Sequence, residues 1–80
     1  MYVRKIYSGR MIRQPVNSTN LRSVGYDPRP GTLEIEFTNG SVYQYLDIPA
    51  TVHRGLVTAS SHRDYFARQI RDRYPYRKIE

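Results

Sequence analysis

The clearest pattern in the chain is a strict alternation of apolar and polar residues between residues 32 and 38. Leu33, Ile35 and Phe37 fall on one face, and the residues between them are polar or charged. A period of two predicts a half-buried β-strand. Asn39-Gly40 follows directly and is a strong signal for a β-hairpin turn.

The same reasoning predicts two more strands. One lies beyond the turn, over residues 41–48, and another precedes the alternating segment, over residues 21–27. The loop over residues 27–31 is rich in proline and glycine, which is typical of a turn. Together the strands predict a three-stranded antiparallel meander.

The apolar spacing changes after residue 48. Pro49 is expected to open a short helix, with Val52, Leu56 and Ala59 as its apolar stripe. A second helix is expected to begin at Ser60 or Ser61, a typical helix-capping residue.

This second helix would bury Phe66 and Ile70, extend its apolar stripe to Tyr74 and end at Pro75. The predicted fold is therefore α+β: a three-stranded antiparallel meander followed by two short helices packed on one face. Residues 12–80 form this domain, and residues 1–11 are an N-terminal extension, either a basic arm or an edge strand. The tail over residues 76–80 is a candidate edge strand.

The position of Tyr43 and Tyr45 depends on the hairpin turn. A two-residue turn places both tyrosines opposite the apolar face of the preceding strand, whereas a three-residue turn with a bulge at Gly40 places them on that face. The two-residue turn is favoured because it groups Val42 and Leu46 with the apolar residues. It would also put the tyrosines beside two glutamates, which repel phosphate.

Composition adds a charge argument. The 80 residues carry a net charge of +6, and nearly all of the 13 basic residues are arginines. Arginine binds phosphates with a planar fork and stacks on bases, so the charge favours nucleic acid as a partner. The chain has no cysteine and no apolar run long enough to span a membrane. A cytoplasmic location without membrane association is expected.

The residues do not suggest an enzyme. His53 and His62 have no acid spaced to orient either ring, and the serines next to His62 are explained by helix capping. We expect no catalytic residue, no metal site and no cofactor.

Basic and aromatic residues alternate near the C-terminus. The segment contains Arg71, Arg73, Tyr76, Arg77 and Lys78. Arginines among tyrosines can both neutralise phosphates and stack on bases, as in proteins that bind single strands. With Tyr43 and Tyr45, these residues are the candidates for a nucleic-acid site.

The ordered set of motifs resembles the KTSC domain, a small bacterial domain also found at the C-terminus of some lysyl-tRNA synthetases. The resemblance runs from about residue 13 to 77 and rests on several short segments. They are Pro15-Val16-x-Ser18, Val24-Gly25-Tyr26-Asp27, Leu33-x-Ile35-x-Phe37-x-Asn39-Gly40, Tyr43-x-Tyr45, Ile48-Pro49, Ala59-Ser60, Tyr65-Phe66, Ile70-Arg71 and Tyr74-Pro75. His62 departs from the family, which usually has glycine there.

The resemblance implies an uncharacterised domain for which RNA binding is the usual suggestion, with Tyr43 and Tyr45 as its central aromatic pair. The leading hypothesis is a non-catalytic RNA-binding module. The alternative is a protein-protein interaction or homo-oligomerisation module that uses an uncovered aromatic face of the sheet.

Overall fold

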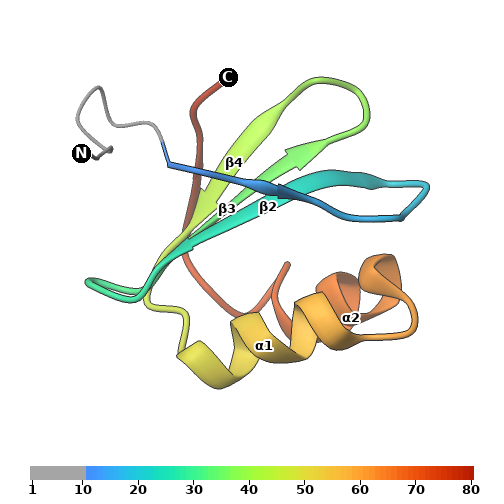
Figure 1. The fold of residues 1–80 in the computed structure, drawn as a ribbon. Coiled ribbons are helices and arrows are strands. Elements are labelled where there is room, and N and C mark those ends of the chain that lie inside the picture. Colours follow the sequence, from blue (N-terminus) through green and yellow to red (C-terminus); the bar gives the residue numbers. More distant parts are fainter. Residues whose placement is uncertain (1–10) are drawn as a thin grey trace.

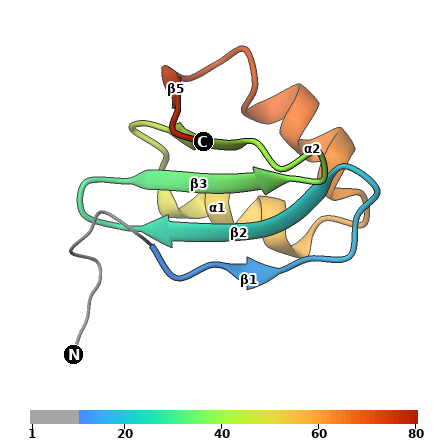
Figure 2. The ribbon, with the colours of Figure 1, turned by 90° about the horizontal axis from the view of Figure 1, so that it is seen from above.

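The computed structural model describes residues 11–80, which form a five-stranded antiparallel sheet with both helices on one face (Figures 1 and 2). The strands lie side by side in chain order. The elements are β1 (Gln14–Pro15), β2 (Leu21–Asp27), β3 (Thr32–Phe37), β4 (Val42–Tyr45), α1 (Ala50–Thr58), α2 (His62–Gln69) and β5 (Tyr76–Lys78). The α+β class and the two helices on one face are as predicted.

The predicted number of strands was wrong, because the sheet has five strands and not three. The additional strands are its two edges: β1 pairs with β2, and β5 pairs with β4. Both edges are two or three residues long and exposed, so they lack the apolar alternation that marks a half-buried strand. The suggested return of the tail as an edge strand is confirmed as β5. The extension predicted over residues 1–11 lies, apart from Met11, outside the described residues.

The β3–β4 turn has three residues, so the favoured two-residue turn was wrong. The backbone N–H of Phe37 donates to the carbonyl of Ser41, and the N–H of Gly40 donates to the carbonyl of Phe37, both at 2.9 Å. Gly40 has a φ of 93°, a left-handed conformation that glycine adopts readily and that is typical of a three-residue hairpin loop with a bulge.

The extra turn residue decides which face the tyrosines occupy. Tyr43 lies opposite Ile35, and Tyr45 lies opposite Leu33. Both tyrosines therefore share the face of the apolar residues of β3, and the two helices lie against this face (Figure 1). The aromatic face of the sheet is consequently covered at Tyr45, whereas Tyr76, which lies opposite Tyr45 on the same face, is exposed.

The core lies between the sheet and the helices. Its buried residues are Leu21, Val24, Leu33, Ile35, Tyr45, Ile48, Leu56, Phe66 and Ile70. The predicted cap of α2 is confirmed, since the Ser61 hydroxyl accepts a hydrogen bond from the Asp64 N–H at 3.1 Å. The helix ends at Gln69, earlier than predicted. The N–H groups of both Ile70 and Arg71 converge on the carbonyl of Phe66, at 3.0 Å each, and close the last turn.

On the face away from the helices, one row of polar side chains crosses the sheet. Gln44 Nε2 donates to Glu34 Oε1 at 2.9 Å, and Arg77 Nε donates to Gln44 Oε1 at 2.9 Å. Arg13, just before β1, forms an ion pair with the other Glu34 oxygen. We call Arg13, Glu34, Gln44 and Arg77 the polar row. It links both edges of the sheet to its centre.

Gly25 explains how Arg13 reaches Glu34. It lies beside Glu34 on β2, between the two partners of the ion pair. A Cβ at this position would lie 2.7 Å from the carbonyl oxygen of Ile12 and 3.0 Å from Cγ of Arg13. The missing side chain therefore lets the Arg13 side chain cross β2.

His53 on α1 packs against the sheet through a stacked contact. Its ring lies 4.4 Å from that of Tyr26 with an interplanar angle of 10°, and the Tyr26 hydroxyl donates to the carbonyl of Ile48 at 2.6 Å. Burial, and then the positive charge of Arg54, lower the pKa of His53 from its ordinary value of 6.5. The histidine thus serves as a neutral packing residue.

This lowered pKa predicts that acid weakens the fold. The unfolded chain binds a proton at His53 more readily than the folded chain, so the free energy of unfolding falls as pH drops through about 6.5 towards the lower folded-state pKa. Urea unfolding at about pH 7.5 and about pH 5.5 should show this loss. His53→Phe keeps the stacked ring without the proton and should lose less stability. An equal loss in both proteins would contradict this role for His53.

Candidate nucleic-acid interface

A cleft of about 450 Å³ opens between one end of the sheet and the segment that follows α2. We call it the aromatic cleft. One part is lined by five rings, those of Phe37, Tyr43, Tyr45, Phe66 and Tyr76. Another part is lined by the polar residues Asn20, Thr38, Asn39 and Ser41, and Arg71 and Asp72 complete its wall. Its size lies within the range of about 300–1,000 Å³ that is usual for small-ligand sites.

The five rings form one continuous cluster. Tyr45 contacts Phe66 edge-on at a centroid distance of 5.4 Å and lies nearly parallel to Tyr43 at 6.3 Å. Tyr76 on β5 completes it, 5.8 Å from Tyr43 and 5.7 Å from Tyr45. These separations are typical of packed aromatic pairs. The side chains of Tyr43 and Tyr45 on β4 thereby support Tyr76 from the core side.

Burial is graded across this cluster. Tyr45 is 4% exposed, whereas Tyr76 is 59% exposed. Burial raises the pKa of the Tyr45 hydroxyl to about 12, with further contributions from Tyr43 and Tyr76. Tyr45 is therefore neutral and structural at physiological pH, and Tyr76 is the ring that a ligand can reach.

The structure brings together four of the seven predicted site residues in the aromatic cleft: Tyr43, Tyr45, Arg71 and Tyr76. Lys78 lies opposite Tyr43, two residues after Tyr76 on the same strand. Alternate residues of a strand point to the same face, so Lys78 lies on the cleft side of β5.

The remaining two candidates lie elsewhere. Arg73 donates through Nε to the carbonyl of Arg68 at 3.0 Å and so satisfies a group near the end of α2. Arg77 belongs to the polar row on the opposite face of the sheet. The basic segment is thus divided between two faces, because Tyr76, Arg77 and Lys78 alternate along a strand.

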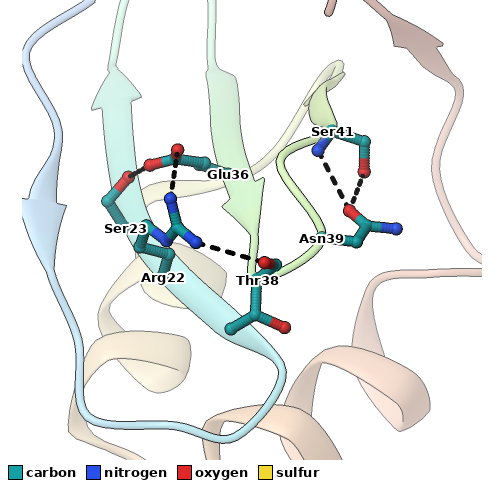
Figure 3. Close-up of polar contacts among 6 residues, drawn as sticks. All are labelled: Arg22, Ser23, Glu36, Thr38, Asn39 and Ser41. Atoms are coloured by element: carbon teal, nitrogen blue, oxygen red, sulfur yellow. Dashed lines mark hydrogen bonds and ion pairs between the residues drawn. The ribbon is translucent and has the colours of Figure 1, made fainter.

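The glutamates that were expected beside the tyrosines are on the other face. Glu34 is held in the polar row, and Glu36 accepts hydrogen bonds from Ser23 Oγ at 3.0 Å and from Arg22 at 3.4 Å (Figure 3). Arg22 also donates to the carbonyl of Thr38 at 3.1 Å. With these carboxylates turned away and paired, the predicted repulsion of phosphate by the two glutamates does not apply to the aromatic cleft, where Asp72 is the acidic residue on the wall.

Sequence reasoning assigned other roles to several cleft residues. Phe37 and Phe66 were predicted as core, which agrees with their packing, and Asn39 was identified as a turn residue. Asn20 and Asp72 were not selected for the site. A polar residue in a turn or after a helix carries no sequence signal for a ligand. Only the tertiary fold brings it close to site residues that are far away in the sequence.

The two histidines do not form a joint site. His53 stacks on Tyr26, and His62 donates through Nδ1 to the carbonyl of Leu56 at 2.8 Å. Across residues 11–80, no three histidine, cysteine or acidic side chains are grouped so that they could hold a metal ion. The described helices include none that is long and apolar enough to cross a membrane.

These features define a small α+β domain with a ring-lined cleft at one end of its sheet. A model of the KTSC domain family matches residues 17–74, most of the chain. The chain belongs to the KTSC domain family.

Individual relatives agree with this assignment. An uncharacterized protein from Stutzerimonas stutzeri is 37% identical over 71 residues, which cover 88% of this chain and all of that protein. A KTSC domain protein from Yersinia pestis has a crystal structure with a TM-score of 0.83 and 40% identity, over 89% of this chain and all of that one. Neither name specifies a catalytic activity.

A lysine–tRNA ligase from Nostoc sp. is similar over a shorter segment. It is 34% identical over 59 residues, which are 74% of this chain but 10% of the ligase. The similarity to lysyl-tRNA synthetases expected from the sequence is therefore confirmed for this segment.

Proposed function

We propose that this KTSC domain is a non-catalytic RNA-binding module that takes a single-stranded segment into the aromatic cleft. The observation that carries the proposal is Tyr76, an exposed ring held on a cluster of packed rings beside a basic side chain. A base stacks on an aromatic ring whose face is accessible. A ring that is already held in place loses little side-chain entropy on binding, so the affinity is higher. The occurrence of a similar segment in a lysine–tRNA ligase is consistent with an RNA ligand.

In this proposal the aromatic and basic residues have separate roles. Tyr76 stacks on a base, and Tyr43 supports it from within the cleft. Arg71 and Lys78 contact the phosphates on either side. Arg71 is 58% exposed and lies 3.9 Å from Asp72, an exposed pair that is weak enough for a phosphate to replace its carboxylate.

The first test is a titration of labelled single-stranded RNA, followed by fluorescence anisotropy at two salt concentrations. Two phosphate contacts on a single strand predict a roughly sevenfold loss of affinity between about 50 and about 200 mM salt. Tyr76→Ala should weaken binding by about 5- to 150-fold, the usual range for one stacked base. No binding by the unaltered protein at low salt would contradict the proposal.

A pair of charge-matched variants separates the cleft from general electrostatic attraction. Arg71→Gln should reduce the salt dependence by about one phosphate contact. Arg77→Gln removes the same charge from the opposite face and should have a much smaller effect. Equal effects of the two variants would indicate attraction by net charge alone.

A further inference from the structure

The domain has a second cleft, of about 470 Å³, which the proposed function leaves without a role. Its walls are residues 17–19, in the loop between β1 and β2, and residues 60–64, which lead into α2. This loop and the start of α2 lie at the same end of the domain (Figures 1 and 2). All of the lining side chains are polar or charged, and no tyrosine or phenylalanine is among them.

The second cleft and the aromatic cleft are bounded by the same loop and the same helix. Asn20 lines the aromatic cleft, and Thr19, its neighbour in the chain, lines the second cleft. On α2, Phe66 lines the aromatic cleft and Asp64 lines the second one, and two residues of a helix differ in height by only about 3 Å. The two clefts are therefore adjacent, and the exposed Thr19 lies at the boundary between them.

Two serines of the second cleft have hydroxyl protons to donate. Ser18 Oγ accepts from the N–H of Asn20 at 3.1 Å and from that of Leu21 at 3.3 Å. Ser61 Oγ accepts from the N–H of Asp64 at 3.1 Å. A backbone N–H can only donate, so these contacts use the oxygens as acceptors, and no hydrogen bond within residues 11–80 uses either hydroxyl proton. Such O–H groups are among the usual donors to phosphate oxygens.

The second cleft also holds a cation and two acceptors. Arg63 lies 3.6 Å from the Asp64 carboxylate, and the two side chains are 63% and 57% exposed. So exposed a pair is weak, which leaves the guanidinium able to contact a phosphate and the carboxylate able to accept from a hydroxyl. His62 donates through Nδ1 to the carbonyl of Leu56 at 2.8 Å, so Nε2 of the neutral ring is an acceptor. An RNA backbone presents the complementary groups, because its phosphates accept and its 2′-hydroxyls can also donate.

We infer that the second cleft is a subsite for the ribose–phosphate backbone of the RNA strand whose base stacks on Tyr76. The aromatic cleft extends from Tyr76 on β5 to Asn20, so the strand continues past Thr19 into the second cleft. There Arg63 contacts a third phosphate, in addition to the two that the aromatic cleft holds. This inference rests on the proposed function. It requires that affinity and its salt dependence both increase once the strand is long enough to reach the second cleft.

The test compares a uridine trinucleotide with a uridine octanucleotide by fluorescence anisotropy. The trinucleotide has two internucleotide phosphates, which is enough for the aromatic cleft alone. Its affinity should fall roughly sevenfold between about 50 and about 200 mM salt, whereas that of the octanucleotide, with a third contact, should fall roughly 18-fold. Arg63→Gln should reduce the loss for the octanucleotide to roughly sevenfold and leave the trinucleotide unchanged.

Arg54→Gln is the control, because it removes the same charge from an exposed position on α1 that lines neither cleft. It should leave the two strands with different salt dependences. Equal salt dependence of the two strands in the unaltered protein would overturn the second subsite and leave the RNA-binding proposal intact. Equal effects of Arg63→Gln and Arg54→Gln on the octanucleotide would also overturn it, because net charge would then explain the longer strand. Failure of both strands to bind would overturn both inferences.

Discussion

Tyr45→Ala is expected to lower the free energy of unfolding by about 3–5 kcal/mol, as is usual when a large buried aromatic side chain is removed. Tyr45 is 4% exposed and contacts the rings of Phe66, Tyr43 and Tyr76. The variant would leave a cavity at the junction of the sheet and α2. A domain of this size has little stability in reserve, so much of the protein could unfold at 25 °C. Urea unfolding followed by circular dichroism measures the change.

Tyr76→Ala is the matched control for this prediction. It removes the same type of side chain from the same aromatic cluster, but the residue is 59% exposed. We expect a loss below about 1 kcal/mol. A near-neutral effect of Tyr45→Ala would contradict the three-residue turn, since only that register places the residue in the core.

This pair of tyrosines also guides the binding experiments. Loss of RNA affinity in Tyr45→Ala would be uninformative, because the variant would be partly unfolded. Tyr76→Ala should remain folded, so its loss of affinity can be assigned to the missing ring. The exposed and buried members of the cluster therefore separate binding from stability.

Glu34→Ala should cost about 3 kcal/mol. The Glu34 side chain is 3% exposed and holds Arg13 through one oxygen and Gln44 through the other. Removing it leaves the Arg13 side chain, which is 20% exposed, and the buried Gln44 amide without their partner. The expected loss lies at the lower end of the range for broken buried ion pairs, because water still reaches Arg13. Chemical unfolding at neutral pH is the measurement.

Glu36→Ala is a close control, on the same strand and the same face. Its contact with Arg22 spans 3.4 Å, and the two side chains are 21% and 56% exposed. A loss of no more than about 1 kcal/mol is expected for so exposed a pair. If the two glutamate variants lost equal stability, the polar row would have no special role. The double variant Arg13→Leu/Glu34→Leu should recover much of the loss, because no charge is then left unpaired.

The sequence determined the elements of the central sheet and helices. Leu33, Ile35 and Phe37 alternate strictly, and this period specifies a strand without any tertiary information. The capping serine of α2 and its buried residue Phe66 follow from equally local patterns. The family, too, was evident from the ordered motifs, because their identity and spacing are properties of the chain itself.

The tertiary structure decided the register and the grouping of the site. A single extra turn residue at Gly40 reverses the face of every side chain on β4, and the choice between the two turns depends on what each face then packs against. Pairing of the tail with β4 as a strand likewise placed Arg77 on one face and Tyr76 on the other. Short edge strands such as β1 and β5 form because the neighbouring strand offers unpaired backbone groups, and no pattern of their own reveals them.

The aromatic cleft depends on both kinds of information. Its tyrosines and Arg71 were identified from the sequence, since aromatic and basic residues near one another already suggest stacking and phosphate contacts. Asn20, Asn39 and Phe66 line the cleft with them only because the tertiary fold places the residue before β2, the β3–β4 turn and α2 around one cavity. Local periodicity fixes which residues of one element share a face, whereas contacts between distant elements fix which faces meet.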